Sequence, residues 1–319
     1  MSDKTFELED LPGIGKITAE KLRSAGYFTI ESVAVAPSKE LSEAVGIGQE
    51  KAIEVSAKAR EMLDLRLQTA AELMEARKHV SKLTTGSKAF DNLLQGGVES
   101  QAVLELTGEY GAGKTQVCFT LCVTSHLTPE QGGLGGGTLY IDTEGTFRPE
   151  RVAQIAQEYD IDPYEVLSGI VVARAFNSDH QILIVNKANE IITNRNLKLV
   201  VVDSLIGHFR AEYLGRENLA VRQQKLNLHL HKLLRLAEIH NIPIVITNHV
   251  IATPDVFFGP TSKPAGGHVL AHFSTNRLFI RKGRRGVRIA KVIDSPYLPD
   301  SECVFIITEK GIEDTSEDT

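Results

Sequence analysis

The chain has 319 residues, a formal net charge of -6 at pH 7, 42% hydrophobic residues and 24% charged residues. This composition excludes a wholly disordered chain and, at the usual domain size, predicts two domains, one of them small. Three cysteines exclude a disulfide framework and favour a reducing compartment. The negative charge argues mildly against a partner held by bulk electrostatics, such as nucleic acid.

Membrane and secretion signals are not expected. The most apolar stretch, residues 197–209, is interrupted by Lys198 and Asp203 and is too short to span a bilayer. The acidic first ten residues lack the basic and then apolar layout of a signal peptide. We therefore expect a cytoplasmic protein without a membrane partner.

Residues 1–65 are predicted to form a small helical domain. Two glycine turns, 13–15 and 46–48, each lead into a helical pattern, which is typical of a paired helix-hairpin-helix module. A glycine turn lets backbone N–H groups approach a phosphate, and the helix that follows points its N-terminus there. DNA contact is one interpretation of this module, and a helical adaptor domain is the other.

The following chain is predicted to be a linker and then an α/β domain. Residues 66–83 form the linker, which becomes helical over 70–78, and from 84 to 312 short apolar runs alternate with stretches of helical spacing. The expected strands are Val103–Thr107, Leu139–Thr143, Ile170–Arg174, Leu199–Asp203 and Ile244–Asn248, and the expected helices are Lys114–Ser125, Pro149–Tyr159, Ser178–Thr193 and Glu217–Asn241. Continuous apolar runs favour parallel strands buried on both faces, hence a doubly wound sheet.

The C-terminal part follows a different pattern. Short strands with glycine turns over 277–312 predict an antiparallel extension of the sheet, and the acidic tail 313–319 is expected to be disordered. The run from Arg277 to Lys291 is basic and contains no acidic residue. Part of it is expected to contact phosphates, either of duplex DNA or, through Lys291, of a nucleotide, unless it is simply a solvated hairpin.

A phosphate-binding loop is predicted between the first strand and the first helix of the α/β domain. The segment Gly108-Glu109-Tyr110-Gly111-Ala112-Gly113-Lys114-Thr115 fits G-x-x-x-x-G-K-[ST] in the strand-to-helix context that this motif requires. Backbone N–H groups then surround the phosphates, Lys114 reaches the β and γ oxygens, and the Thr115 hydroxyl binds Mg²⁺.

Two acidic residues are expected at the same edge of the sheet. Asp203 ends a buried strand, where ligand sites lie in open α/β sheets, and is the second candidate ligand of Mg²⁺. Glu144 follows another strand end and is the candidate general base that activates water. Asp142 competes for that role or else supports the end of its strand.

The ordered motifs of the chain resemble those of the RecA-like strand-exchange recombinases. The stretches that carry the resemblance are TGS and FDNLLQGG in 85–97, GEYGAGKTQ in 108–116, YIDTEGTFRPER in 140–151, HFRAEYLGRENLAVRQQKL in 208–226, ITNHV in 246–250, GGHVLAH in 266–272 and DSPYLP in 294–299. With the helical domain in front, the chain is similar to the archaeal RadA branch. The resemblance implies an α/β, RecA-like P-loop ATPase core with a mostly parallel sheet, preceded by a small all-α helix-hairpin-helix domain.

The function that the resemblance implies is DNA recombination in repair. Members form filaments on single-stranded DNA, with ATP and Mg²⁺, and exchange strands with a homologous duplex. We expect a homo-oligomer, as a helical filament or a ring, that associates with the nucleoid. A regulatory paralogue that binds DNA and ATP without strand exchange is the alternative, and a ring-forming helicase with the same nucleotide site is a third reading.

The resemblance also assigns residues around the nucleotide. Glu144 matches the catalytic glutamate, Gln116 follows the P-loop threonine, and Arg151 matches the arginine that stacks near the adenine. Asp294 and Pro299 match a cap that the neighbouring protomer places over the ATP. A nucleotide held between two subunits would let its binding control the geometry of the filament.

Two loops are implied to face the DNA. In the first, Arg216 matches the DNA-contacting arginine of the family, with Arg210 and Arg222 on either side, and a loop that enters a helix is expected there. Arginine suits phosphate because it forms bidentate hydrogen bonds. A solvated charged surface is the alternative.

The second loop, residues 250–265, is expected to lack regular structure. Its aromatic residues Phe257 and Phe258 are candidates to stack with or wedge between bases. His268, just after the loop, matches a position that senses the γ-phosphate in some relatives. His249 replaces a glutamine that links ATP to this loop in relatives, so both histidines are expected to couple ATP to DNA.

A polymerisation motif is expected in the linker. The family docks a Phe-x-x-Ala segment on the next protomer, and the matching residues are Leu67 and Ala70. Burial of a leucine still contributes about 1.5–3 kcal/mol, although its shape differs from that of an aromatic ring.

Since the basic residues cluster in the first loop and in 277–291, the negative net charge does not exclude DNA.

Overall fold

The computed structural model describes residues 7–25, 27, 29–63, 69–252 and 262–315. The chain divides into two compact units, Met1–His79 with Asn189–Ile191, and Val80–Ala188 with Ile192–Thr319. The division falls inside the segment that the sequence predicts to be a linker, residues 66–83. Each unit is described by itself.

The N-terminal unit is all-helical. Its elements are η1 (Leu8–Asp10), α1 (Lys16–Ser24), α2 (Ile30–Ala34), α3 (Ser38–Val45), α4 (Gln49–Met62), α5 (Ala70–Ala76) and η2 (Arg77–His79). Leu22, Ile30 and Leu41 are among the residues that form its apolar core. Gly46 adopts a φ of 68° at the end of α3, a left-handed conformation that favours glycine, so the chain can turn directly into α4.

Helix α5 begins at a capping box in the described part of the linker. The Thr69 hydroxyl accepts a hydrogen bond from the Glu72 N–H (3.2 Å), and the Glu72 carboxylate accepts one from the Thr69 N–H (2.7 Å). This reciprocal pair satisfies two backbone donors and fixes where the helix starts. Ala70 is exposed in the first turn. Leu67 lies outside the described residues.

The second unit is built on a large sheet in the strand order β12-β11-β10-β9-β3-β7-β6-β4-β5. The strands from β9 to β5 in this order are parallel, and β10, β11 and β12 extend the sheet in antiparallel fashion, as the sequence predicts. Their bounds are β3 (Val103–Gly108), β4 (Gly137–Asp142), β5 (Ile170–Arg174), β6 (Leu197–Asp203), β7 (Ile244–Ala252), β9 (Asn276–Lys282), β10 (Arg288–Asp294), β11 (Glu302–Thr308) and β12 (Gly311–Asp314). A separate pair joins β1 (Lys82–Leu83) to β2 (Val98–Glu99).

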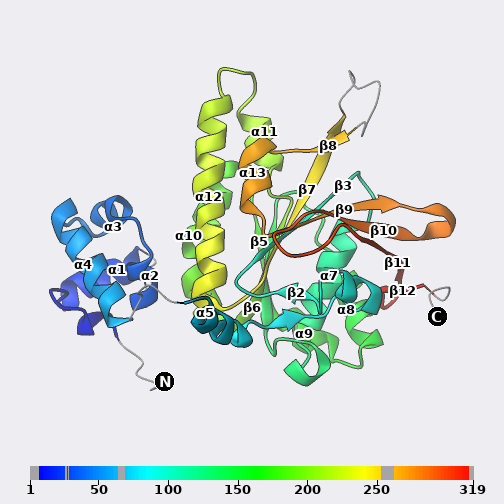
Figure 1. The fold of residues 1–319 in the computed structure, drawn as a ribbon, viewed down its shortest axis with the longest axis horizontal. Helices are drawn as coiled ribbons and strands as arrows, with labels where there is room; N and C mark the ends of the chain where they lie inside the picture. The colour runs from blue at the N-terminus through cyan, green and yellow to red at the C-terminus, as the bar shows by residue number, and fades with distance from the viewer. Residues whose placement is uncertain (1–6, 26, 28, 64–68, 253–261, 316–319) are drawn as a thin grey trace. The chain divides into compact units, whose positions relative to one another are not determined.

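Helices cover both faces of the sheet (Figure 1). Their bounds are α6 (Lys88–Leu93), α7 (Lys114–Thr124), η3 (Pro129–Gln131), α8 (Pro149–Glu158), α9 (Pro163–Gly169), α10 (Ser178–Arg195), α11 (Gly207–Glu212), α12 (Leu219–His240), α13 (Gly267–Phe273) and η4 (Arg284–Gly286). The long helices α10 and α12 lie side by side on one face, and α7 and α8 lie on the other. Every residue of β3 and β4 is buried as a result, which explains why their sequences are largely apolar, with buried polar exceptions such as Glu105 and Asp142. Within the described ranges no helix combines the length and apolar character needed to cross a membrane.

The base of the second loop is a β-ribbon. Strand β7 continues to Ala252 and pairs with β8 (Ser262–Pro264) in antiparallel register, with Val250 opposite Pro264. The expectation of a loop without structure over 250–265 is therefore wrong at both ends, because backbone pairing continues beyond the sheet. Phe257 and Phe258 lie outside the described residues.

The predicted disorder of the tail is also wrong at its start. Glu313 and Asp314 belong to β12, and the Asp314 carboxylate accepts hydrogen bonds from the Ser87 hydroxyl (2.5 Å), the Lys88 N–H (3.1 Å) and the Ala89 N–H (2.9 Å). This carboxylate closes the N-terminus of α6, where an anion is stabilised by the free N–H groups. Residues 316–319 lie outside the described chain.

A buried ion pair crosses the middle of the sheet. Glu105 on β3 is fully buried, and its Oε2 accepts hydrogen bonds from Arg277 Nε (2.7 Å) and the Ser274 hydroxyl (3.1 Å). Its Oε1 accepts one from Asn248 Nδ2 (2.8 Å). Arg277 is itself only 8% exposed. The basic run 277–291 is thus not one charged surface, because its first residue neutralises a core carboxylate.

Replacement of Arg277 by alanine is expected to destabilise the protein by about 3–5 kcal/mol, because it leaves the Glu105 charge buried without its partner. The free energy of unfolding in urea measures this loss. Arg281→Ala is the matched control, since Arg281 lies 3.6 Å from Glu302 in an exposed pair and should cost less than about 1 kcal/mol. Equal losses in the two variants would contradict this account of the buried pair.

Candidate nucleotide-binding site

Four neighbouring parallel strands bring the predicted site residues to one edge of the sheet. The strands are β3, β7, β6 and β4, and their carboxyl ends meet there. Gly108 lies opposite His249, and Asp142 lies opposite Asp203, in the register of the sheet. The loop after β3, the turn after β4 and the ends of β6 and β7 therefore surround one point, as expected for a ligand site in an open α/β sheet.

The loop after β3 has the geometry of a phosphate cradle. Gly111 and Gly113 adopt φ values of 71° and 114°, which side chains other than glycine rarely tolerate. Gly108 has no space for a side chain, because an added Cβ would lie 2.2 Å from the Ile280 carbonyl oxygen. Helix α7 begins directly after the loop at Lys114, so free N–H groups and the positive end of the helix point toward this cradle.

Lys114 lies beneath the loop and is only 6% exposed. Its ammonium group donates hydrogen bonds to the carbonyl oxygens of Gly108 (2.8 Å) and Glu109 (2.9 Å). Burial lowers the pKa of this lysine, and the negative charges of Asp203 and Glu144 act in the opposite direction. A lysine held by two carbonyl groups of the loop suits the recognition of phosphate, because its charge is kept close to the cradle.

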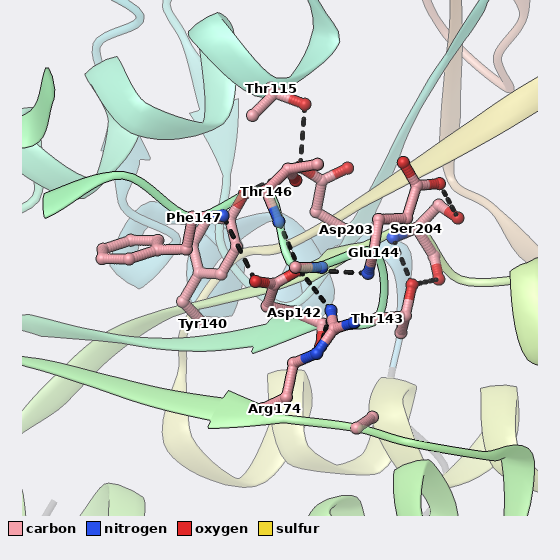
Figure 2. A network of polar contacts seen from close by, with 12 residues as sticks. Thr115, Tyr140, Asp142, Thr143, Glu144, Thr146, Phe147, Arg174, Asp203 and Ser204 are labelled. Atoms are coloured by element: carbon pink, nitrogen blue, oxygen red, sulfur yellow. Dashed lines mark hydrogen bonds and ion pairs between the residues drawn. The ribbon is translucent and has the colours of Figure 1, made fainter.

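Asp203 is buried at the end of β6 and is surrounded by hydroxyl groups. Its Oδ2 accepts hydrogen bonds from Thr115 Oγ1 (2.9 Å) and the Tyr140 hydroxyl (2.7 Å), and its Oδ1 accepts one from Thr247 Oγ1. Burial and the nearby Asp203 charge raise the pKa of Tyr140 well above its usual value. Figure 2 shows Asp203 and Thr115 facing each other between α7 and the sheet.

The donors at this point suit a hard divalent cation. The Thr115 hydroxyl and the Asp203 carboxylate are oxygen ligands of the kind that Mg²⁺ uses together with phosphate and water. Among the described residues, no group of three or more His, Cys, Asp or Glu side chains is placed to hold a metal. A cation bound here would therefore depend on the phosphates of a nucleotide for much of its coordination.

Asp142 organises the turn that carries the catalytic candidate. Its Oδ1 accepts hydrogen bonds from the N–H groups of residues 144, 145 and 146, and its Oδ2 accepts one from the Phe147 N–H (Figure 2). Arg174 adds an ion pair at 3.2 Å. Both oxygens of Asp142 are occupied by backbone N–H groups or by Arg174, so neither is placed to accept a proton from water. These contacts favour Asp142 as a support for the strand end and the turn over the alternative that it is the general base.

Glu144 extends from this turn toward the strand ends. Its Oε1 accepts hydrogen bonds from the Ser204 hydroxyl (2.8 Å) and from His249 Nε2 (2.6 Å). The bond from His249 is the largest cause of a lowered pKa of Glu144, with smaller contributions from Ser204 and Lys114, while burial acts in the opposite direction. The carboxylate is therefore held ionised, as a proton acceptor must be.

Ser204 is a site residue that the sequence analysis missed. It follows Asp203 through a cis peptide bond, its N–H donates to Thr143 Oγ1 (2.8 Å), and its carbonyl accepts from the same hydroxyl (2.8 Å). Its own hydroxyl then reaches Glu144. The available signal was its position: a small hydroxyl residue directly after a buried strand that ends in aspartate.

Arg151 lies next to the start of α7. Its guanidinium donates to Gln116 Oε1 (2.9 Å), to the Glu309 carbonyl (2.8 Å) and to the Thr308 carbonyl. Burial lowers the pKa of Arg151. These contacts place Arg151 and Gln116 together beside the P-loop. Stacking of the arginine on an adenine stays a prediction.

Asp294 and Pro299 are not brought to the site of their own chain. Strand β10 begins at Arg288, opposite Lys282, and Lys282 lies against Gly111 of the P-loop. The strand then runs away from the loop and ends at Asp294. Both predicted cap residues are exposed and lie away from the P-loop of their own chain.

The three predicted DNA-binding arginines follow β6. Arg210 is exposed on the short helix α11, Arg216 is exposed in the turn before α12, and Arg222 is half-buried in the first turns of α12. The expected loop entering a helix is found at 213–218, but Arg210 belongs to a helix. His268 lies in α13, just after the ribbon of β7 and β8.

Comparison with known proteins identifies the family. The sequence model of the Rad51 family matches residues 76–315, which is well over half of the chain. This chain belongs to the Rad51 family. A SAM-like helix-hairpin-helix tandem matches residues 6–61. The DNA repair and recombination protein RadA of Metallosphaera sedula is 51% identical over 311 residues, which cover 97% of this chain and 96% of that protein.

These matches confirm the resemblance and the fold class predicted from the sequence motifs. Membership of the Rad51 family also makes the chain a nucleotide-binding protein. The roles of the individual residues at the edge of the sheet follow from the geometry described above and stay proposals.

The turn held by Asp142 yields a prediction. Asp142→Asn would set an amide N–H against the backbone N–H groups and weaken the pair with Arg174, so Glu144 should be displaced. We expect nucleotide turnover to fall at least about tenfold while nucleotide binding is kept, because the cradle is untouched. Asp162→Asn is the control: Asp162 accepts from the Tyr164 N–H at the start of α9, where asparagine serves equally well. Unchanged turnover in Asp142→Asn would contradict this positioning role.

Proposed function

We propose that this protein is an ATP-dependent DNA recombinase that forms filaments on single-stranded DNA and exchanges strands with a homologous duplex in repair. The observation that carries the proposal is the meeting of a phosphate cradle, a buried aspartate and an anchored glutamate at one edge of the sheet. The similarity to RadA of Metallosphaera sedula extends over nearly the whole length of both chains.

The P-loop would hold ATP and its metal. The proposed nucleotide contacts are Gly108, Glu109, Tyr110, Gly111, Ala112, Gly113, Lys114, Thr115 and Gln116. Thr115 and Asp203 would hold Mg²⁺, which neutralises charge on the phosphates. Glu144 then accepts the proton of the attacking water through an oriented carboxylate, and Lys114 stabilises the negative charge that develops on the phosphate.

A second subunit completes this site in the proposal. Asp294 and Pro299 are exposed at the edge opposite the P-loop, which supports their assignment as a cap over the ATP of a neighbour. Arg151 would contact the adenine from the same chain as the P-loop. ATP then binds more tightly to one arrangement of two subunits than to others, and its binding and hydrolysis can change the filament.

DNA binding is assigned to the segments that leave β6 and β7. Arg210, Arg216 and Arg222 lie on the segment that follows Asp203 and Ser204, so the nucleotide site and the candidate phosphate contacts share one connection. Phe257 and Phe258 are proposed to stack with bases, and His249 and His268 to couple ATP to this loop. Association with the nucleoid would follow from binding to chromosomal DNA.

Assembly into a homo-oligomer also has support in the sheet. Strand β5 is an edge strand, and Val172 (44% exposed) and Phe176 (72% exposed) lie on it or directly after it. An edge strand with exposed apolar side chains can pair with a segment of another chain. We propose Leu67 and Ala70, in the linker, as the segment through which one copy contacts the next.

Glu144→Gln tests the catalytic assignment. The amide keeps the size of the side chain and can still accept the Ser204 bond, but it cannot take a proton, so ATP hydrolysis stimulated by single-stranded DNA should fall at least about a hundredfold. Filaments in ATP and Mg²⁺, followed by negative-stain microscopy, should persist. The control is Glu150→Gln, which changes an exposed residue on α8. Hydrolysis at the parent rate would exclude Glu144 as the base.

Arg216→Ala tests the first DNA-binding segment. Loss of one phosphate contact should weaken binding of single-stranded DNA and reduce the salt dependence of log K by about one unit, with ATP affinity unchanged. Fluorescence anisotropy with a labelled oligonucleotide at several salt concentrations measures both quantities. Arg195→Ala removes an exposed arginine before β6, at the other edge of the sheet, and is the matched control. Identical effects in the two variants would contradict the assignment.

A regulatory paralogue is the second candidate function. The change of an aromatic residue to Leu67 in the polymerisation motif and the presence of His249 favour it. A strand-exchange assay separates the two functions, because a paralogue would bind ATP and DNA without joining homologous strands. Closed rings without helical filaments in negative-stain micrographs of the protein would instead favour a helicase-like assembly.

A further inference from the structure

A histidine lies in direct contact with the candidate general base. His249 is on β7, Glu144 is in the turn after β4, and β6 lies between these two strands in the sheet. The distance between His249 Nε2 and Glu144 Oε1 is 2.6 Å. The two side chains are 31% and 33% exposed, so solvent and ligands can reach them, but they are not freely mobile surface groups.

The two oxygens of the Glu144 carboxylate differ in their contacts. Oε1 accepts bonds from both His249 and the Ser204 hydroxyl. Within the described part of the chain, Oε2 has no hydrogen-bond partner. One oxygen is thus anchored from two strand ends, β6 and β7, and the other is available to a water molecule. Oε1 therefore fixes the position of the carboxylate, and Oε2 can accept the proton.

We propose that His249 is a positioning residue that makes the strength of the general base depend on its own protonation. This inference rests on the proposed function of Glu144 in ATP hydrolysis. A protonated imidazole binds the carboxylate through a charge-assisted hydrogen bond and makes it a weaker proton acceptor. A neutral imidazole still donates to Oε1 through an ordinary bond, so the carboxylate keeps its place and recovers its basicity.

The direction of the effect follows from the same contact. The bond from His249 is the leading cause of the lowered pKa of Glu144. A carboxylate with a lowered pKa stays ionised at acid pH but accepts a proton less readily. As the pH falls through the range in which imidazoles gain a proton, hydrolysis slows, and as the pH rises through it, hydrolysis speeds up.

Other charged groups lie around this end of β7. They are Lys114 at the start of α7, Asp203 at the end of β6 and Glu109, which follows the Gly108 that lies opposite His249, while α12 presents the neutral amide of Gln223 through a bond to the Gly266 carbonyl. Burial lowers the pKa of Lys114, so the comparison with His249→Gln, which keeps Lys114 and both carboxylates, isolates the contribution of the histidine. A histidine is the side chain that ordinarily titrates within about pH 5–8.

The backbone around His249 connects the base to the ribbon of β7 and β8. The His249 carbonyl accepts a hydrogen bond from the Ala265 N–H (2.8 Å), and Asn248 Nδ2 donates to the Ala265 carbonyl (2.7 Å). Asn248 is fixed in turn by the buried Glu105. The backbone that carries the imidazole is therefore hydrogen-bonded on the side of Ala265, and the preceding residue is tied to the core, which suits a group that must hold a carboxylate in a defined place.

The test compares the pH profiles of ATP turnover in the parent and in His249→Gln. Glutamine donates a hydrogen bond of similar reach but carries no charge at any pH. Between pH 8 and pH 6 the parent is expected to lose about tenfold in kcat, the difference between a neutral and a charge-assisted bond, and the variant to lose less than about twofold. His231→Gln, an exposed histidine on α12, should keep the parent profile.

Binding and chemistry are separated in the same experiment. Equilibrium binding of a fluorescent ATP analogue should be equal in the parent and in His249→Gln at both pH values, since the cradle is unchanged. Circular dichroism checks that His249→Gln is folded. A second variant, His249→Asn, carries a shorter amide that does not reach Glu144 Oε1. It should lower kcat at every pH without restoring a pH dependence. A parent profile that persists in folded His249→Gln overturns the proposal.

A second measurement does not require turnover. The ring ¹³C signals of the ten histidines can be followed against pH, and the signal missing in His249→Gln identifies His249. This signal should change in Glu144→Gln, because the imidazole no longer contacts a carboxylate. An unchanged signal contradicts the contact. A parent without any ATP hydrolysis at pH 8 would contradict the proposed function, while this signal would still decide whether His249 and Glu144 interact.

Discussion

The arrangement of the site depends on one buried carboxylate, that of Asp203. A carboxylate that is removed from water must receive hydrogen bonds, and here they come from Thr115 on α7, Tyr140 on β4 and Thr247 on β7. Three elements that are distant in the sequence are thereby fixed to the end of β6. Glu144 and His249 each lie a few residues beyond one of these anchors, so their contact is a consequence of the way Asp203 is satisfied.

A second buried carboxylate in the same sheet is satisfied differently. Glu105 is paired with the guanidinium of Arg277, so its charge is neutralised within the core. The hydroxyl groups around Asp203 satisfy its hydrogen bonds but leave its negative charge uncompensated by direct contact. This difference explains why one carboxylate belongs to the scaffold and the other suits a cation: only the second keeps a charge that a metal ion beside phosphates can neutralise.

The sequence predicted the strands, the main helices and the position of the P-loop because these follow from local patterns. Buried parallel strands produce apolar runs, and the P-loop is a continuous motif. The contacts within the site could not be predicted from local patterns. Glu144 and His249 are 105 residues apart, and Glu144 and Ser204 are 60 apart, so their meeting depends on strand order and register. The β7–β8 ribbon and the capping by Asp314 were missed for the same reason, since backbone pairing and long-range capping leave no local signal.

The position of the proposed cap constrains the symmetry of the assembly. The P-loop lies at the carboxyl ends of the parallel strands, whereas Asp294 and Pro299 lie at the opposite edge of the same sheet. If the cap of one subunit covers the nucleotide of the next, the two surfaces in contact are different, and the interface is head-to-tail. In a head-to-tail assembly each added subunit still presents one of the two surfaces to a further subunit. The assembly therefore becomes either a closed ring or an open helix, according to the rotation between subunits. In this proposed arrangement, a nucleotide that bridges the interface would act directly on that rotation, and ATP bound at each contact would influence the geometry of the whole assembly.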